Sequence, residues 1–280
     1  MKLFRKAGDI HDFLVKNRKQ GNTVGFIPTM GALHPGHISL VQASKRSDSI
    51  SVCSIFVNPT QFNDSKDFEN YPTTIEKYID QLEKWGCDVL FLPPVTEMYP
   101  NGTGHAKKYE LGYLESVLEG KYRPGHFQGV CQVVNRLLDI VPADQLYLGQ
   151  KDYQQCMVIK KLVENENIKT RISICPTLRE PDGLAMSSRN LRLPDANRKK
   201  AVKIFETLSY LKDHISPGNL EALKQDLVQG LAADDFKVDY LEIADAGTLE
   251  LLAEWDGKKP LVALIAAFLD NVRLIDNMLL

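Results

Sequence analysis

The chain has 280 residues, of which 44% are hydrophobic and 25% charged, and its formal net charge at pH 7 is −2. This length supports one large domain or two smaller ones, and the composition is that of an ordinary soluble globular protein. The nearly balanced charge gives no reason to expect nucleic acid or an anionic membrane as a partner, so any anionic ligand must be held by local geometry.

Cysteine usage and the N-terminal segment indicate the compartment. The five cysteines are scattered singly and form no C-x-x-C pair, so we interpret them as small core residues in a reducing environment. Residues 1–20 are charged throughout and lack the apolar centre of a signal peptide, and the longest apolar run, residues 261–269, is too short to span a bilayer. We therefore expect a soluble, cytoplasmic protein.

Short apolar runs alternate with helical patterns over the first two-thirds of the chain. The predicted strands, rich in β-branched and aromatic residues, are 24–27, 51–57, 89–92, 145–148 and 171–174. The predicted helices between them are 39–45, 74–85, 130–138 and 156–164. Strands that are apolar on both faces and separated by helices indicate a parallel sheet, which binds ligands beyond the carboxyl ends of its strands.

The pattern changes at about Thr177. A loop rich in charge and serine, residues 179–192, precedes two helical patterns whose leucines and other apolar residues recur every three or four positions. Residues 238–243 and 261–268 follow as predicted strands. We predict an α/β fold in which a parallel-sheet domain (1–176) is followed by a smaller α+β domain (177–280).

The stretch 29–37 reads T-M-G-A-L-H-P-G-H. It lies between the predicted strand 24–27 and the predicted helix 39–45. A helix N-terminus favours an anion, and the imidazoles of His34 and His37 can donate hydrogen bonds to phosphate oxygens. Gly31 and Gly36 let the backbone approach a ligand. The stretch therefore predicts a nucleotide site, whereas a zinc site would need further ligands that no cysteine cluster or H-E-x-x-H motif supplies.

Two later segments offer phosphate-binding groups. Lys151, in Gly149-Gln150-Lys151-Asp152, follows a predicted strand and can reach a phosphate as a point charge, although this segment taken alone fits an exposed turn with a solvated Lys–Asp pair better. The run Ser187-Ser188-Arg189 supplies two hydroxyls and a guanidinium in one short loop, which suits a phosphate but also an ordinary linker.

Two glutamines are candidates for a second substrate. Gln61 follows the second predicted strand, and Gln155 lies four residues after Lys151, on the same face if a helix begins there. Neutral amides suit a small substrate with hydroxyl and carboxylate groups, although surface glutamines are common. Neither a phosphate-loop motif nor G-x-G-x-x-G is present, and no arrangement of nucleophile and base indicates covalent catalysis.

Six motifs in a fixed order give the chain a family resemblance. They are P-T-M-G-A-L-H-P-G-H, F-V-N-P-T-Q-F, E-M-Y-P, G-H-F-Q-G-V, G-Q-K-D-Y-Q-Q and E-P-D-G-L-A-M-S-S-R-N. Together they closely resemble the pantoate–β-alanine ligases of the H-x-G-H nucleotidyltransferase superfamily. The resemblance implies a Rossmann-like domain that binds nucleotide and pantoate, a small C-terminal lid domain, and a homodimer.

The resemblance also implies a reaction in two steps. The pantoate carboxylate attacks the α-phosphorus of ATP to give pantoyl adenylate and pyrophosphate, and the amine of β-alanine then displaces AMP to give pantothenate. ATP is the co-substrate, Mg²⁺ arrives on its phosphates, and no carboxylate metal cage is expected. The adenylate must be kept from water, so a closing lid is expected.

By the same resemblance, each motif residue takes a role. The catalytic residues would be His37, the family's acid, with His34 and Lys151. Gln61 and Gln155 would hydrogen-bond pantoate, and Gln61 would also lie beside β-alanine. The residues implied to bind ATP are Met30, Gly31, Ala32, Leu33, His34, Pro35, Gly36, His37, Gly149, Gln150, Lys151, Asp152, Leu178, Met186, Ser187, Ser188 and Arg189.

The chain departs from the common family pattern at a few positions. Pro35 stands where an acidic residue is frequent, Gln128 where arginine is frequent, and Leu178 where valine is usual; residues 63–66 and Thr73 also differ. None of these removes a polar group that the resemblance assigns. Two other functions remain open: a nucleotidyltransferase acting on a phosphorylated substrate, and a nucleotide sensor without catalysis.

Overall fold

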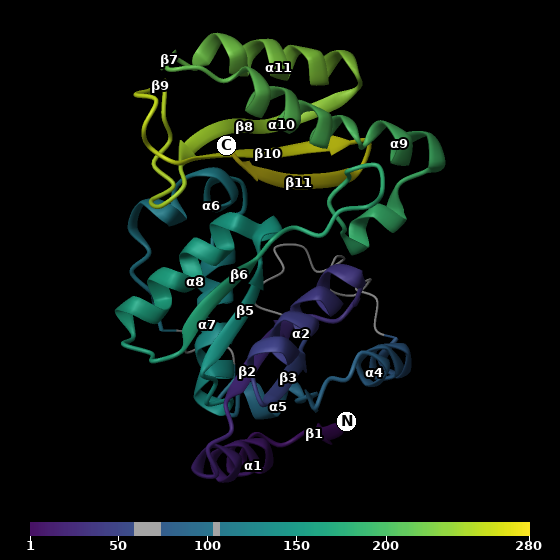
Figure 1. Cartoon of the computed structure of the whole chain (residues 1–280), viewed down its shortest axis with the longest axis vertical. Helices are drawn as coiled ribbons and strands as arrows, with labels where there is room; N and C mark the ends of the chain where they lie inside the picture. The colour runs from purple at the N-terminus through teal and green to yellow at the C-terminus, as the bar shows by residue number, and fades with distance from the viewer. Residues whose placement is uncertain (59–73, 103–106) are drawn as a thin grey trace. The chain divides into compact units, whose positions relative to one another are not determined.

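The computed structural model describes residues 1–58, 74–102 and 107–280. The chain forms two compact units (Figure 1). Unit 1 contains Met1–Gly149 and Val158–Cys175, and unit 2 contains Gln150–Met157 and Pro176–Leu280. The segment around Lys151 therefore packs with the C-terminal part of the chain, although it directly follows a strand of unit 1.

Unit 1 is built on a parallel sheet of six strands. They are β1 (Lys2–Phe4), β2 (Val24–Thr29), β3 (Ile50–Ile55), β4 (Val89–Phe91), β5 (Gln145–Gly149) and β6 (Arg171–Cys175), in the order β1-β4-β3-β2-β5-β6. Every pairing in this sheet is parallel, which confirms the Rossmann-like architecture. Among these six strands only β1 was not predicted from the sequence, because three residues among charged neighbours form no pattern.

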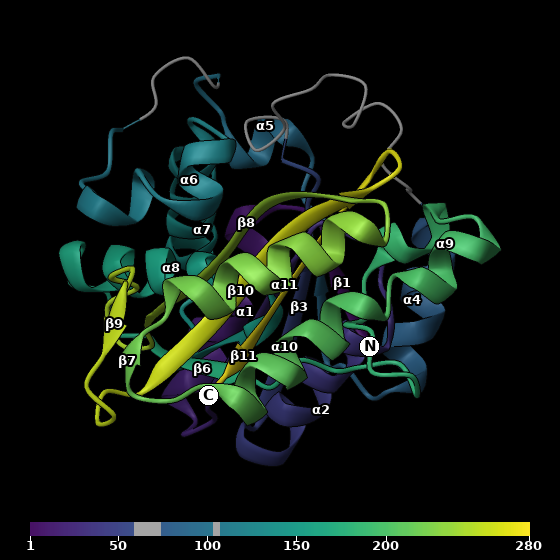
Figure 2. The ribbon, with the colours of Figure 1, turned by 90° about the horizontal axis from the view of Figure 1, so that it is seen from above.

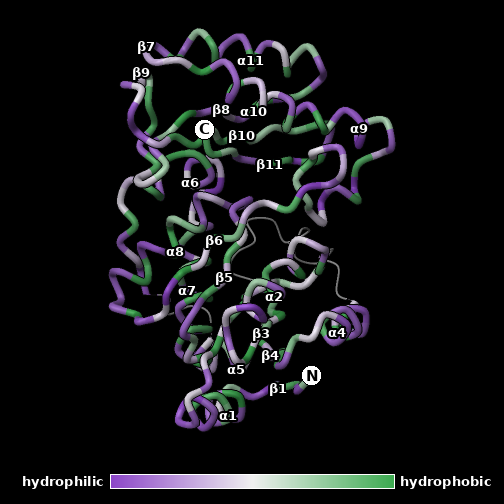
Figure 3. The backbone as a smooth tube through the Cα atoms, viewed as in Figure 1, coloured by the Kyte–Doolittle hydropathy of each residue, from purple (hydrophilic) through white to green (hydrophobic). Residues whose placement is uncertain are grey.

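Helices lie between these strands. They are α1 (Ala7–Lys19), α2 (Pro35–Ser47), α4 (Ile75–Lys84), α5 (Val95–Met98), α6 (Leu118–Tyr122), α7 (His126–Ile140) and α8 (Tyr153–Asn165), with a 3₁₀ turn at Gly112–Glu115. The helices α1 and α4 show both hydrophilic and hydrophobic colours around their turns in Figure 3. Their apolar sides are buried: Ile10 and Leu14 on α1, and Tyr78 and Leu82 on α4. The helix α1 was not predicted, because only two of its thirteen residues are buried.

The strand order identifies a ligand-binding edge in unit 1. From β2 the chain moves outward to β3 and β4, and it then returns to the other side of β2 for β5 and β6. The order thus reverses between the paired strands β2 and β5. In parallel sheets, ligands bind beyond the carboxyl ends of the strands at such a switch point. These ends are Thr29, the first residue of the stretch 29–37 that contains H-x-G-H, and Gly149.

Unit 2 contains an antiparallel sheet of three strands, in the order β11-β10-β8: β8 (Phe236–Asp245), β10 (Leu261–Leu269) and β11 (Val272–Leu279). The helices α10 (Lys203–His214) and α11 (Glu221–Ala233) lie over the same side of this sheet (Figure 2), and their apolar residues join its core. The remaining elements are α9 (Asp195–Lys200), the strands β7 (Gly218–Asn219) and β9 (Glu254–Trp255), and 3₁₀ turns at Gln150–Asp152 and Ser188–Arg192. A smaller α+β part is therefore confirmed, with β11 as a strand that was not predicted.

The cysteines lie where small core residues are expected. Cys53, Cys87, Cys131 and Cys156 are buried, and Cys175 is partly so. Burial raises the pKa of Cys87 to about 11 and that of Cys131 to about 12, so these thiols stay protonated at neutral pH. No helix within the described ranges is both long and apolar enough to cross a membrane.

Candidate nucleotide site

The two histidines of the H-x-G-H stretch cap the helix that follows them. His34 is the N-cap of α2, and its Nδ1 accepts a hydrogen bond from the Gly36 backbone N–H at 3.1 Å. The His37 Nδ1 accepts from the His34 backbone N–H at 3.3 Å, which completes a reciprocal capping box. The ring centroids are 4.1 Å apart. Both imidazoles are therefore held in fixed orientations at the start of α2.

These hydrogen bonds determine the tautomer of both rings. An Nδ1 that accepts a bond from a backbone N–H carries no proton, so the neutral imidazole has its proton on Nε2. Each ring can then donate from Nε2, the atom farther from the helix backbone. The capping box thus sets both rings in the tautomer whose Nε2–H is of the kind that donates to an oxygen acceptor.

The first backbone amides of an anion-binding helix usually have no partner within the protein, but those at the start of α2 do. Pro35 has no N–H, Gly36 donates to His34, and the amides of His37 and Ile38 donate to the His34 carbonyl at 2.8 and 3.3 Å. The first turn holds no acidic residue. The amides of Gly36, His37 and Ile38 are therefore used within the turn, and the features here that favour an anion are the helix dipole and the imidazoles.

The turn between β2 and α2 is tight. Gly31 has φ +91°, and a Cβ there would lie 3.3 Å from the Tyr78 ring. Its N–H donates to the Thr29 hydroxyl, and that hydroxyl donates to the Ser54 carbonyl. Ala32 has φ +47°, and both Ala32 and Leu33 are buried. The residues before His34 are thus set by contacts with the sheet.

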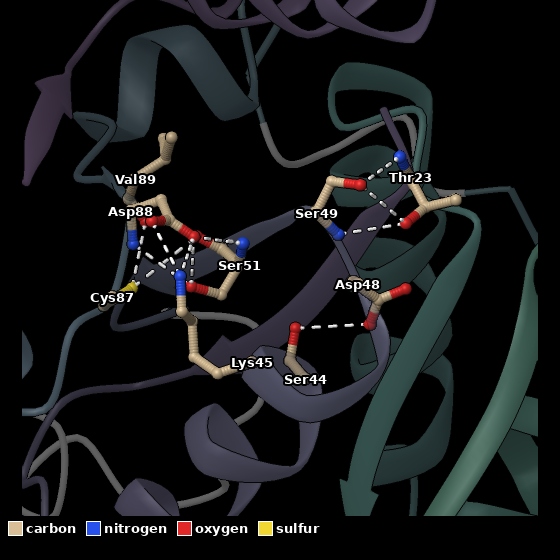
Figure 4. Close-up of polar contacts among 9 residues, drawn as sticks. All are labelled: Thr23, Ser44, Lys45, Asp48, Ser49, Ser51, Cys87, Asp88 and Val89. Atoms are coloured by element: carbon tan, nitrogen blue, oxygen red, sulfur yellow. Dashed lines mark hydrogen bonds and ion pairs between the residues drawn. The ribbon is translucent and has the colours of Figure 1, made fainter. Parts of the chain in front are cut away.

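Polar contacts at the other end of α2 hold the helix against the sheet (Figure 4). The Lys45 ammonium binds both carboxylate oxygens of Asp88 at 2.9 and 2.8 Å, and Asp88 also accepts from the backbone N–H and the hydroxyl of Ser51. Burial works against ionisation of Asp88, but the bonds from Lys45 and Ser51 outweigh it and lower its pKa. The Tyr147 hydroxyl of β5 donates to Asp48, the residue after α2, at 2.6 Å.

Three of the sequence motifs meet at one buried residue. Asn58, from F-V-N-P-T-Q-F, is 0% exposed. It accepts from the hydroxyl of Tyr99, in E-M-Y-P, at 2.9 Å and donates to the carbonyl of Gly129, in G-H-F-Q-G-V, at 3.3 Å. Asn58 therefore connects these motifs in the fold. Gln61, predicted to bind substrate, lies outside the described residues, as does Thr73.

Gln128, one of the departures from the family pattern, has a structural role. Its carboxamide accepts from the Tyr109 N–H and donates to the Tyr109 carbonyl, both at 2.9 Å. The same nitrogen lies 3.0 Å from a carboxylate oxygen of Glu115. The side chain thus pairs with the backbone as a neighbouring strand would, and it ties residues 109–115 to α7.

A small hollow in unit 2 brings together the phosphate-binding residues predicted from two segments. Lys151, Ser187 and Arg189 all line it, together with Asn190, Arg273 and Asp276. Its free space is close to that of one water molecule, which is far too small for a whole nucleotide. Lys151 is 17% exposed and lies 3.6 Å from the Asp152 carboxylate. His34 and His37 belong to the other unit.

The Ser187 loop is stabilised from within unit 2. The Ser187 hydroxyl accepts from the Arg189 N–H at 3.2 Å and thereby caps the 3₁₀ turn at Ser188–Arg192. The Met186 N–H donates to the Leu178 carbonyl at 3.0 Å, so these two predicted residues are neighbours across a narrow hairpin. The hairpin turns at Gly183, where φ is +93° and a Cβ would overlap the Phe205 ring.

Three residues that support the segments around this hollow were not predicted from the sequence: Arg179, Asn277 and Asp276, the last of which lines the hollow itself. Arg179 binds both carboxylate oxygens of Asp276 at 2.6 and 3.1 Å, and Asn277 donates to the backbone carbonyls of Gln150 and Lys151. Burial raises the pKa of Asp276, although Arg179 opposes this effect. An available signal was the adjacent pair Asp276-Asn277 in the largely apolar segment 272–280.

Gln155 lies in the first turn of α8 and is partly buried. Because α8 begins at Tyr153, Lys151 lies in the preceding 3₁₀ turn and the two residues do not share a helix face. Over residues 1–58, 74–102 and 107–280, no group of three or more His, Cys, Asp or Glu side chains could hold a metal ion.

Comparison with known proteins identifies the family. The sequence profile described as Pantoate-beta-alanine ligase matches residues 2–279, almost the whole chain. The chain belongs to the pantoate-beta-alanine ligase family. It is therefore a carbon–nitrogen ligase, and the family resemblance drawn from the six motifs is confirmed.

Curated relatives and solved structures agree with this family. The chain is 42% identical over 279 residues to the "Pantothenate synthetase" of Azobacteroides pseudotrichonymphae, covering 99% of each chain, and 42% identical over 270 residues to that of Cytophaga hutchinsonii, covering 95% of each. A crystal structure of pantothenate synthetase from Thermus thermophilus matches with a TM-score of 0.90 at 36% identity over 99% of each chain. The ligase from Francisella tularensis, described as complexed with Beta-gamma ATP and Beta-alanine, matches with a TM-score of 0.82 at 38% identity over 100% of this chain and 97% of that one.

Proposed function

We propose that this member of the family condenses pantoate with β-alanine through a pantoyl adenylate, consuming ATP and releasing pyrophosphate and AMP. The observation that carries the proposal is the pair of oriented imidazoles at the start of α2. The described complex of the Francisella tularensis relative supports ATP and β-alanine as ligands of this chain.

In the first step, a carboxylate oxygen of pantoate attacks the α-phosphorus, and the bond from that phosphorus to the pyrophosphate oxygen breaks. Negative charge grows on the departing pyrophosphate and on the α-phosphoryl oxygens. The Nε2–H groups of His34 and His37 donate to these oxygens, and the positive end of the α2 dipole favours the same charge. Catalysis then consists mainly of positioning and electrostatic stabilisation.

The phosphate-binding groups of unit 2 act in the same step. Lys151 contributes a point charge, and Ser187, Ser188 and Arg189 contribute hydroxyls and a guanidinium. This assignment is supported by the hollow in unit 2, which Lys151, Ser187 and Arg189 line together. Asn190 also lines it and offers a further hydrogen-bond donor. We also propose that residues 30–37, 149–152 and 178 contact ATP, because the family resemblance implies that role for them.

In the second step, the β-alanine amine attacks the carbonyl carbon of the adenylate, AMP leaves with the bonding electron pair, and the amine loses a proton. We assign Gln61 and Gln155 to pantoate because a carboxamide can both donate and accept. The other family features that we propose are a homodimer, a C-terminal lid and a cytoplasmic location. We place Mg²⁺ on the ATP phosphates, where these phosphates are its main ligands, and derive no step from a protein-bound metal.

Omitting each substrate in turn tests the reaction. We expect AMP to form only with ATP, pantoate and β-alanine together, and pyrophosphate to exchange into ATP when pantoate is present without β-alanine. Exchange that needs a phosphorylated acceptor instead of pantoate would favour a nucleotidyltransferase. Binding of ATP without AMP release from the complete mixture would favour a sensor.

Lys151→Ala tests the assigned lysine. We expect kcat/KM for ATP to fall at least about tenfold, because the substitution removes charge stabilisation made in the transition state. The control is Lys160→Ala, which removes an exposed lysine of α8 and should leave turnover near that of the parent. Near-normal kinetics in Lys151→Ala would reject the role.

A further inference from the structure

The strand β11 contains two adjacent buried polar residues near its end. Asp276 is 3% exposed and Asn277 is 1% exposed, whereas Val272 and Leu274 of the same strand belong to the apolar core. A buried carboxylate and a buried carboxamide destabilise a fold unless hydrogen bonds satisfy them. Their partners therefore indicate what these two residues do.

The carboxamide of Asn277 holds the segment that contains Lys151. Its Nδ2 donates to the backbone carbonyls of Gln150 and Lys151, both at 2.8 Å, and its Oδ1 accepts from the Gln150 side chain at 3.2 Å. Two donors and one acceptor are used at once, and among the ordinary side chains only a carboxamide supplies them from one planar group. The contact fixes the backbone from which the Lys151 side chain extends.

Asp276 and the Asn277 backbone hold the segment that leads to the Ser187 loop. Arg179 binds both oxygens of Asp276, and it also donates to the carbonyls of Asn277 and Gly183 at 3.3 and 3.0 Å. Arg179 in turn forms an antiparallel bridge with Ala185, two residues before Ser187. The two segments that carry the predicted phosphate-binding residues of this hollow are thus tied to consecutive residues of one strand.

We infer that Asn277 is a positioning residue for Lys151, and that with Asp276 it presents Lys151 and the Ser187 loop to the same phosphate chain. Asn277 lies behind the lysine and does not touch the reacting atoms. The inference rests on the proposed role of Lys151 in binding the ATP phosphates. Loss of the carboxamide leaves two carbonyls without their donor and lets the backbone of residues 150–151 shift, so the ammonium no longer lies where charge develops.

A double-mutant cycle separates positioning from general stability. We expect Asn277→Ala to lower kcat/KM for ATP by about tenfold in the parent, but by less than about threefold in the Lys151→Ala background, because the residue acts through that lysine. Val272→Ala is the control: it removes core packing from the same strand and should lower the melting temperature while kcat/KM stays near the parental value. If Asn277→Ala does not fold, Asn277→Ser, which retains one donor, should show a smaller loss that also disappears without Lys151.

The outcomes distinguish this inference from the proposed function. Near-normal kinetics of Lys151→Ala would overturn the role of that lysine and the inference with it. The inference alone would be overturned if Lys151→Ala lowers kcat/KM strongly but the Asn277 variant lowers it by the same factor in both backgrounds. It would also be overturned if the Asn277 variant lowers kcat/KM in neither background.

Discussion

His34 and His37 cap a helix in the same orientation that suits their proposed role in the chemistry. Each uses Nδ1 to cap α2 and thereby leaves its proton on Nε2. The sequence indicated the location of these residues and their suitability for phosphate. It did not reveal that they satisfy the helix amides themselves, because histidine is not among the residues usually expected at an N-cap.

Two substitutions separate capping from chemistry. Asparagine is a favoured N-cap and glutamine suits the third position of a capping box, so His34→Asn and His37→Gln should keep the melting temperature near the parental value. Both lose the Nε2 donor, so kcat/KM for ATP should fall at least about tenfold. Thermal unfolding and steady-state kinetics measure the two effects.

His34→Ala is the matched comparison. It removes the cap as well as the donor, and should therefore also cost about 0.5–2 kcal/mol of stability. Parental activity in His34→Asn and His37→Gln would show that the histidines are only structural.

At the scale of elements, α2 is held at both ends. Its N-terminus follows a tight turn from β2, and Lys45 near its C-terminus binds Asp88, which directly precedes β4 and contacts Ser51 of β3. Helical periodicity predicted the middle of α2 but not its first turn, because a turn closed by His34, Pro35 and His37 presents no apolar periodicity. The strand β11 was missed for a similar reason, since Arg273, Asp276 and Asn277 interrupt its apolar residues.

Asp88 makes the stability of unit 1 depend on pH. The pKa of Asp88 lies below its ordinary value, so the ionised carboxylate stabilises the folded state. This stabilisation is complete above the unfolded-state pKa of roughly 3.9. It is lost as the pH falls through the lower folded-state pKa. We expect Asp88→Asn to lower the free energy of unfolding at pH 7 by about 1 kcal/mol, a modest value because solvent screens the partly exposed pair.

Urea unfolding at pH 7 and pH 3 measures this effect. The difference in the free energy of unfolding between the parent and Asp88→Asn should shrink at pH 3. At that pH protonation of the parental carboxyl begins to remove the charge that Asp88→Asn lacks. Asp226→Asn, at an exposed position of α11, serves as the control and should show little change at either pH. An undiminished difference at pH 3 would contradict the role of the charge.

At the scale of the whole molecule, the chain divides its predicted phosphate-binding groups between two units. The histidines belong to unit 1, and Lys151 belongs to unit 2 although it follows β5 by only two residues. The functional division into residues 1–176 and a lid of residues 177–280 stays a prediction.

The predicted homodimer is tested at this scale. Light scattering on the purified full chain at micromolar concentration should give twice the mass of one chain, since the family resemblance implies a two-fold assembly. A single-chain mass that persists as the concentration is raised would contradict it.

The sequence by itself determined the architecture and the chemical groups. Alternating apolar runs specify a parallel sheet because strands buried on both faces cannot be polar, and glycine and histidine after a strand indicate a ligand edge because a tight turn and a helix terminus belong there. Only the tertiary structure decided which groups hold one another: the capping by His34 and His37, the Gln128 pairing with Tyr109, and the contact of Asn277 with the Lys151 backbone. These contacts join residues distant in sequence or depend on side-chain orientation, and neither periodicity nor motif spacing records such geometry.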